Sequence, residues 1–159
     1  MPKFQFQELV DGARHISARL GSAADVAGRV SDAEVGKFFK LAGESRYDLC
    51  AVGDQIEGRL AAYEPATLDG FSFGSVQVEG RFYVTFDGLQ GTPGTGTLAI
   101  GDYVVCGTPA AKGTALTAPA KVCKATAAGN TLNFKWRVVS LGAAGTGAVG
   151  TTGLIELVC

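Results

Sequence analysis

Apolar and polar side chains alternate along two stretches of the chain, and a period of two is the pattern of a β-strand with one buried face. In residues 76–86, valine and phenylalanine alternate with Gln77, Glu79, Arg81, Tyr83 and Thr85. Residues 131–139 repeat the pattern with Leu132, Phe134, Trp136 and Val138 as the apolar members. An apolar face opposite a polar face is typical of an antiparallel sheet with one side in solvent. We therefore predict a strand in each stretch, with a β-bulge where Gly80 interrupts the apolar face.

Shorter apolar runs separated by turn residues predict further strands. They cover residues 35–41, 48–52, 55–62, 98–100, 103–106, 121–125 and 153–159. Two glycine–aspartate pairs, Gly53-Asp54 and Gly101-Asp102, predict turns. Glycine permits the backbone of a turn, and aspartate can hydrogen-bond the backbone two residues on. We expect the first pair and the runs beside it to form a hairpin.

About eight to ten short strands with turn signals between them predict an all-β fold. The length of 159 residues fits one domain. The 23 glycines are scattered between the strand-like runs rather than periodic, which favours many turns. Two architectures remain open: a β-sandwich of jelly-roll type, and a tulip-like, partly open barrel.

The first 34 residues differ in character from the rest. Apolar residues between Leu9 and Leu20 have an approximately helical spacing that is broken at Gly12 and Gly21. This pattern predicts an N-terminal arm or short helical segment over residues 1–34, followed by a β domain over residues 35–159. Phe4 and Phe6 alternate with polar residues, as in an arm that adds a strand to a partner. The alternative is a frayed terminus.

Residues 87–97 form the most glycine-rich loop near the middle of the chain. Its tip contains Gly91, Thr92, Pro93 and Gly94. The loop is either a plain hairpin connection or a contact loop that becomes ordered against a partner, since exposed loops on rigid sheets often carry contacts.

Charge and cysteine content narrow the classes of protein. The net charge is −1, from 14 basic and 15 acidic residues, so we expect no nucleic-acid partner. No run approaches the roughly 20 apolar residues of a membrane span, and no signal peptide is visible, so we expect synthesis in a reducing cytoplasm. The four cysteines lack the close spacing of a zinc or redox motif, which predicts reduced, buried thiols.

The chain shows no pattern of catalytic residues. His15 is the only histidine, and the carboxylates are dispersed, including Asp54 and Asp102, which lack the acidic cluster of a calcium site. The glycines of residues 91–96 are followed by a predicted strand, whereas a phosphate-binding loop needs a helix there. Trp136 is either a core residue or a ligand-stacking group. We therefore predict a non-enzymatic protein with no catalytic residue, cofactor or metal site.

Several segments resemble tailed-bacteriophage capsid decoration (cement) proteins, over roughly residues 35–159. Small members of that family often have a Gly-Lys-x-x-Lys-Leu strand, a Gly-Asp-x-Ile-x-Gly hairpin and a later Gly-Asp turn. Here these are residues 36–41, 53–58 and 100–105, with residues 153–158 as the usual last strand. The first 34 residues have no clear counterpart in the family.

The resemblance implies a β-sandwich or tulip-like barrel that binds the outside of an expanded phage head. It implies the major capsid protein as partner, a dimer or trimer on the shell, a virion location on the capsid exterior, and no cofactor. Phe4 and Phe6, and the loop from Gly91 to Gly94, are then the candidate shell contacts. Two alternatives stay open: another virion component (tail tube, fibre or head completion), and a carbohydrate- or ligand-binding module with Trp136, Tyr83 and Tyr103 as stacking groups.

Deletion of residues 1–12 tests the arm hypothesis. We expect weaker attachment to shells in a co-sedimentation assay and an unchanged unfolding transition, because the arm lies outside the predicted β domain. Attachment equal to that of the full chain would refute a role for the arm.

Overall fold

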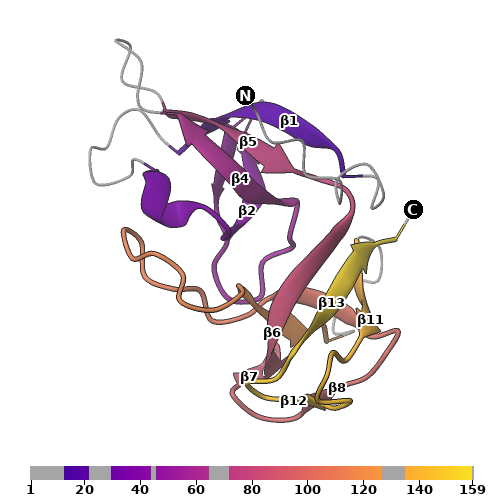
Figure 1. Ribbon diagram of the computed structural model, residues 1–159. Coiled ribbons are helices and arrows are strands. Elements are labelled where there is room, and N and C mark those ends of the chain that lie inside the picture. The colour runs from indigo at the N-terminus through magenta and orange to yellow at the C-terminus, as the bar shows by residue number, and fades with distance from the viewer. Residues whose placement is uncertain (1–12, 22–29, 44–45, 65–71, 127–134, 159) are drawn as a thin grey trace.

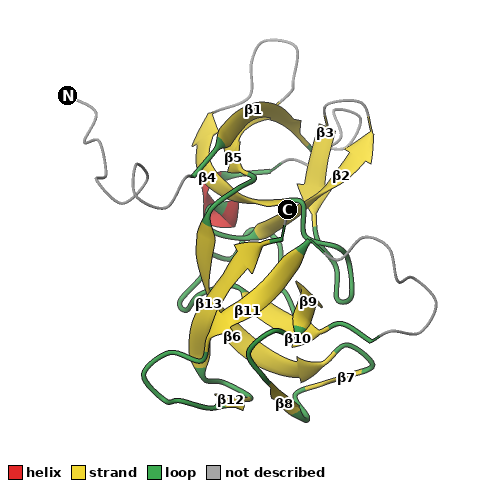
Figure 2. Ribbon diagram, turned by 90° about the vertical axis from the view of Figure 1, so that its right-hand side faces the viewer, coloured by secondary structure: helices red, strands yellow, loops and turns green. Residues whose placement is uncertain are grey.

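The computed structural model describes residues 13–21, 30–43, 46–64, 72–126 and 135–158, whose regular secondary structure is almost entirely β-strand (Figure 1). The exception is a single 3-10 turn, η2 (Asp32–Glu34). The predicted all-β class is confirmed. The strands form two bodies stacked end to end, with β1 to β5 in one and β6 to β13 in the other (Figures 1 and 2).

The first body is a closed barrel of five strands. In chain order they are β1 (His15–Leu20), β2 (Phe38–Gly43), β3 (Arg46–Leu49), β4 (Gly58–Glu64) and β5 (Ser72–Gln77). Their order around the barrel is β1-β3-β2-β4-β5, and β5 pairs with β1 to close it. Only β1 and β3 run parallel. Closure leaves no unpaired edge in the ring.

The second body is also a ring, with a small extension. The ring strands are β6 (Arg81–Leu89), β13 (Thr152–Leu157), β11 (Trp136–Ser140), β9 (Tyr103–Cys106) and β10 (Lys121–Lys124). The ring closes because β10 pairs with both β9 and β6. Strand β7 (Thr92–Pro93) folds back on the end of β6, and β8 (Thr97–Leu98) pairs with β12 (Gly147–Ala148) beside the ring.

The helix expected near the N-terminus is wrong for the residues that the structure describes. His15–Leu20 is strand β1, which pairs with β5 along its whole length and with β3 at Arg19 and Leu20. Ala18 and Leu20 are buried in the first barrel. These residues therefore belong to the β fold, because cross-strand pairing and burial outweigh a weak helical spacing.

The strand expected over residues 76–86 is two strands in different barrels. The chain leaves β5 after Gln77 and enters β6 at Arg81, and Gly80 in between has a φ of 105°. Val76 is buried in the first barrel, whereas Phe82 is buried in the second. The break keeps the alternation in phase, so Gly80 marks a change of barrel rather than a bulge within one strand.

The apolar side chains form two separate cores. Phe39 packs in the first, with Leu60 and Val76. Phe38 packs in the second, where Phe82 and Trp136 are stacked with ring centroids 4.3 Å apart. Adjacent residues of β2 therefore serve different cores. Burial along residues 35–41 does not follow side-chain polarity either, since Leu41 is exposed and Lys37 is buried.

Four turns in the described residues, at 34–37, 51–54, 99–102 and 148–151, share one geometry and one way of binding a strand. The third residue of each is a glycine with φ between 82° and 90°. The N–H of the fourth residue donates to the carbonyl of the first, at 3.0 to 3.1 Å. A type II turn has this bond and requires positive φ at the third position.

Each of these turns is fixed to a strand by a pair of hydrogen bonds. The glycine N–H donates to a strand carbonyl, and the N–H of the same strand residue donates back to the fourth residue of the turn. The strand residues are Leu60, Cys106, Val138 and Phe86, in the order of the turns. Three of the turns extend a ladder within one barrel. The turn at 51–54, which we call the joint turn, binds a strand of the other barrel.

The hairpin expected around Gly53-Asp54 is therefore wrong. Strands β3 and β4 lie on opposite sides of β2 and do not pair with each other. The chain between them leaves the first barrel, contacts β9 through the joint turn, and returns.

Replacement of Gly101 by alanine measures the backbone requirement of these turns. A Cβ at Gly101 would meet nothing within 4 Å, so the φ of 90° is the only obstacle. We expect Gly101→Ala to lower the free energy of unfolding by about 1 to 2 kcal/mol in urea. Gly91→Ala is the control, because its Cβ also meets nothing and its φ is not positive. Equal stability of the two variants would contradict the argument.

Candidate functional site

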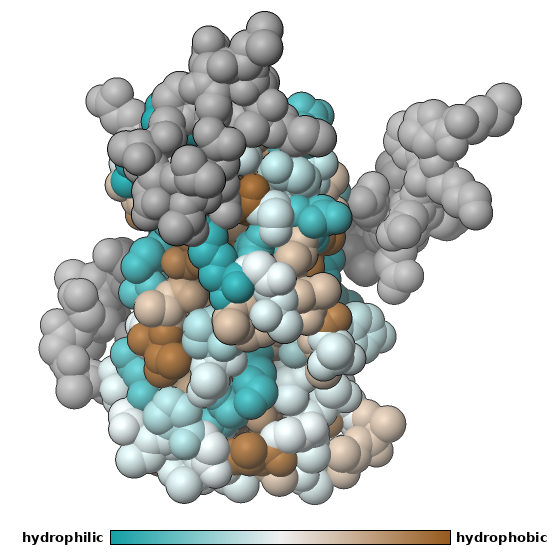
Figure 3. Space-filling model, turned by 90° about the vertical axis from the view of Figure 1, so that its left-hand side faces the viewer, coloured by the Kyte–Doolittle hydropathy of each residue, from teal (hydrophilic) through white to brown (hydrophobic). Residues whose placement is uncertain are grey.

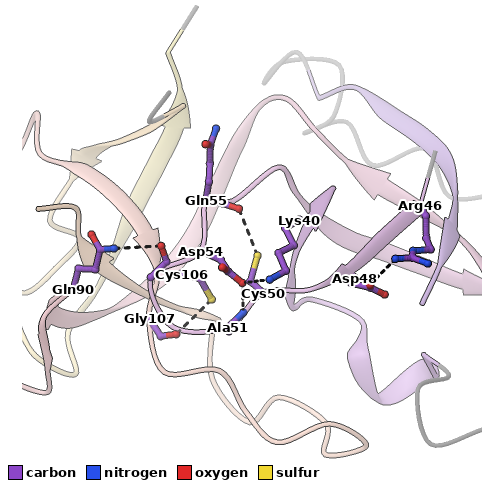
Figure 4. A network of polar contacts seen from close by, with 11 residues as sticks. Lys40, Arg46, Asp48, Cys50, Ala51, Asp54, Gln55, Gln90, Cys106 and Gly107 are labelled. Carbon is purple, nitrogen blue, oxygen red and sulfur yellow. Dashed lines mark hydrogen bonds and ion pairs between the residues drawn. The ribbon is translucent and has the colours of Figure 1, made fainter. Parts of the chain in front are cut away.

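The joint turn holds the two barrels together through its backbone and its aspartate. Gly53 N–H donates to the Cys106 carbonyl at 2.8 Å, and Cys106 N–H donates to the Asp54 carbonyl at 2.9 Å. The Asp54 carboxylate accepts from Ala51 N–H at 2.7 Å and from Lys40 Nζ at 2.6 Å (Figure 4). This bond from Asp54 raises the pKa of Lys40.

The turn at 99–102 repeats the arrangement within the second barrel. Asp102 accepts from Ala99 N–H at 2.8 Å and pairs with Lys124 Nζ at 2.8 Å. In both turns the aspartate bonds the N–H three residues before it, and not the backbone two residues on that we expected. The two aspartates are therefore fixed by a turn and a lysine, which explains their positions by structure alone.

Trp136 is a structural residue of the second core. Its side chain is fully buried, and its Nε1–H donates to the carbonyl of Ile56 at 3.0 Å, across the junction of the barrels. The stacking of Trp136 on an external ligand is therefore excluded. An ion pair between Lys135 and Glu57 also crosses the junction.

A cavity of about 290 Å³ lies at the junction, beneath the segment of residues 107–120. Its floor contains Phe38, Cys50 and Cys106, and its cover is rich in alanine, threonine and proline. The cover is held at both ends, by Thr108 N–H donating to Asp87 at 2.7 Å and by the Thr85 hydroxyl donating to the Pro119 carbonyl at 2.9 Å.

A buried ion pair holds the middle of this cover. Glu34 is fully buried and accepts from Ser31 N–H at 2.7 Å, from the Ser31 hydroxyl at 2.6 Å and from Gly113 N–H. Lys37 Nζ pairs with Glu34 at 3.5 Å and donates to the Ala111 carbonyl at 2.9 Å. Burial raises the pKa of Glu34, but the bonds from Ser31 and Gly113 and the charge of Lys37 together leave it lowered.

The outer surface of the second barrel carries tyrosine and arginine side chains in register across four strands. Arg81 on β6, Glu156 on β13, Arg137 on β11 and Tyr103 on β9 are successive partners in the ladders. Tyr83 lies two residues along β6 from Arg81. We call these five residues the tyrosine–arginine face.

Charge and exposure make this face suited to contact with another molecule. Tyr83 and Tyr103 are 61% and 44% exposed. Glu156 bridges the two arginines, at 3.5 Å from Arg81 and 3.1 Å from Arg137. The face therefore has one excess positive charge. Tyrosine and arginine are the residue types enriched where binding energy concentrates in protein interfaces.

Comparison with protein-family models, with curated proteins and with solved structures gives no match. We therefore infer the candidate site from the residues of this chain alone.

The other surfaces offer less. In the view of Figure 3, apolar side chains lie in small groups separated by polar ones, without the large patch that marks an apolar interface. No group of three or more metal-ligating side chains occurs among the described residues. In the same residues, no helix is long and apolar enough to cross a membrane.

The predicted contact residues have different places in the structure. Phe4 and Phe6 lie outside the described residues. Gly91, Thr92, Pro93 and Gly94 form an exposed tip at β7, where an added Cβ at Gly91 or Gly94 would meet nothing within 4 Å. Figure 1 shows this tip at the end of the second barrel, beside β8 and β12.

Some important residues were not singled out from the sequence. The Glu34–Lys37 pair had one available signal, because Ser31 and Glu34 form a capping box at η2. Glu57 pairs with Lys135, and the Arg59 guanidinium lies 5.0 Å from the centre of the Phe82 ring.

The pH dependence of stability tests whether ionised Glu34, through its bonds, stabilises the fold. A group whose pKa is lowered by folding stabilises the protein above its unfolded pKa, and this contribution is lost as the pH falls through the folded pKa. We expect Glu34→Gln to be less stable than the wild type by about 2 to 3 kcal/mol at pH 7. The difference should shrink below about pH 4 in urea unfolding. A difference that is constant from pH 7 to pH 3 would contradict the assignment.

Proposed function

We propose that this protein is a capsid decoration protein that binds the outer surface of an assembled phage head and stabilises the shell by bridging capsomers. The observation that carries the proposal is the tyrosine–arginine face, displayed on a closed barrel. The resemblance of residues 35–159 to decoration proteins supports it, and the proposed partner is the major capsid protein of the same virus.

The chemistry of the face suits a protein partner with exposed carbonyl or carboxylate oxygens. Each arginine has five N–H donors, and Arg81 and Arg137 share the single carboxylate of Glu156, so donors remain for a partner. Tyrosine has few rotatable bonds and loses little entropy on binding. Because the face lies on paired strands, little ordering is needed when a complex forms.

Decoration needs only modest affinity per copy. A single interface in the micromolar range contributes about 8 kcal/mol at standard state. A ligand that binds only the assembled shell stabilises that state by mass action, and repetition over many sites multiplies the effect. A compact scaffold with one binding face is sufficient for this role, and a dimer or trimer would add a second contact.

A carbohydrate-binding module is the second candidate, because Tyr83 and Tyr103 are exposed aromatic side chains. Burial of Trp136 removes the third stacking group that this candidate would have used. The two tyrosines lie on β6 and β9, which are not neighbours in the closed ring, and both side chains are on its outer surface. A single sugar ring cannot reach both, so the decoration role is the better supported.

Co-sedimentation with undecorated expanded heads tests the proposal. The wild-type chain should pellet with the heads and give a 16.3 kDa band at a simple ratio to the major shell protein. We expect Tyr83→Ala and Arg137→Ala each to weaken binding about tenfold, since hot-spot residues contribute more than 1 kcal/mol.

Leu41→Ala is the matched control, because Leu41 is 55% exposed on the first barrel, away from the face. It should bind as the wild type does. If the wild-type chain stays in the supernatant, the decoration role is refuted. Saturable binding to a glycan array that is lost in Tyr83→Ala would then favour the carbohydrate module.

A further inference from the structure

Two cysteines from different barrels meet at the floor of the junction cavity. Cys50 follows β3 and precedes the joint turn, whereas Cys106 ends β9. Both line the same cavity, and they are 4% and 2% exposed. Figure 4 shows both residues beside the joint turn, with each sulfur atom directed to a backbone carbonyl oxygen.

The backbone fixes the distance between these two residues. The joint turn, which begins directly after Cys50, binds both the N–H and the carbonyl of Cys106. The neighbouring Cys106 thiol raises the pKa of Cys50, as expected for two thiols that lie close together. Their other contacts are weak: Cys50 Sγ lies 3.7 Å from the Gln55 carbonyl oxygen, and Cys106 Sγ lies 3.4 Å from that of Gly107. Neither bond prevents rotation of a sulfur toward its neighbour.

We propose that Cys50 and Cys106 are a disulfide site, at which a small peroxide-class oxidant forms a covalent bond between the two barrels. One sulfur attacks a peroxide oxygen, the O–O bond breaks, and a sulfenic acid and one water result. The second thiol then attacks the sulfenic sulfur, the S–O bond breaks, and a second water leaves. Overall, two thiols and one hydrogen peroxide give one disulfide and two waters.

The cavity is large enough for the oxidant. Its volume of about 290 Å³ admits hydrogen peroxide, since a water occupies only about 30 Å³. The neighbouring Cys106 thiol and burial both raise the pKa of Cys50, so the reaction is slow at neutral pH and accelerates as the pH rises.

Cys123 provides a matched control within the same region. It lies on β10 beside β9, but in the ladder Cys106 is opposite Val122, and Cys123 is opposite Val105. Successive residues of a strand point to opposite faces, so Cys123 and Cys106 point away from each other. Burial raises the pKa of Cys123 to about 11, and its thiol faces the carbonyl of Asp87.

The test treats the purified, fully reduced 159-residue chain with hydrogen peroxide. The peroxide is then removed, the chain is denatured and alkylated, and its mass is measured. We expect two of the four thiols to escape alkylation and a peptide map to show Cys50 linked to Cys106. Oxidation should raise the melting temperature by roughly 5 °C or more, because the bond closes a long loop, and a reductant should reverse the shift.

Variants assign the bond to its two residues. Cys50→Ser and Cys106→Ser should each abolish the linked peptide and the thermal shift, whereas Cys123→Ser should form the bond at the wild-type rate. Alkylation of all four wild-type thiols after peroxide would overturn the proposal. So would a linkage through Cys123 or Cys159. None of these results depends on the proposed function.

Discussion

The arrangement of the molecule depends on the pair of hydrogen bonds between the joint turn and Cys106. The turn projects from the first barrel with Gly53 at positive φ, so that its N–H and the next carbonyl meet both backbone groups of a residue in the second barrel. A buried backbone group without a partner is costly, so this two-way bond satisfies the end of β9 while it fixes the position of the other barrel. The Asp54 carboxylate stabilises the turn by accepting from Ala51 N–H within it and from Lys40 Nζ on β2.

The same turn serves three ladders inside the barrels, which shows how one local geometry has two uses. At 34–37, 99–102 and 148–151 the turn lengthens a ladder between strands that already pair. At 51–54 the turn instead binds Cys106 of the other barrel, and no described strand of one barrel pairs with a strand of the other. Apolar packing joins the barrels at the same place. Phe38 and Ile56, from the chain of the first barrel, pack in the core of the second with Trp136, whose indole N–H donates to the Ile56 carbonyl. Polar and apolar contacts thus stabilise one junction together.

The exposed tyrosine–arginine face and the contacts that hold the two barrels together lie in different parts of the molecule. The tyrosine–arginine face lies on strands that pair with a neighbour on both sides, so its side chains are held at fixed spacing. The junction instead contains the cavity, the buried Glu34–Lys37 ion pair and the thiols of Cys50 and Cys106. The decoration role that we propose needs both properties, a rigid contact surface and resistance of the fold to separation of the barrels.

The sequence by itself determined the all-β class, and its alternation placed Tyr83 and Arg81 opposite the apolar side chains of β6. These are local properties, because a period of two needs only neighbouring residues. The tertiary structure alone decided that Phe38 and Phe39 face different cores, that Gly80 separates two barrels, and that Tyr103 and Arg137 share a row with Arg81. Register and closure depend on pairing between residues far apart in the chain, and similar apolar runs do not specify their partners. For the same reason the meeting of Cys50 and Cys106 could not be predicted from their spacing: it exists only because the joint turn binds the opposite barrel.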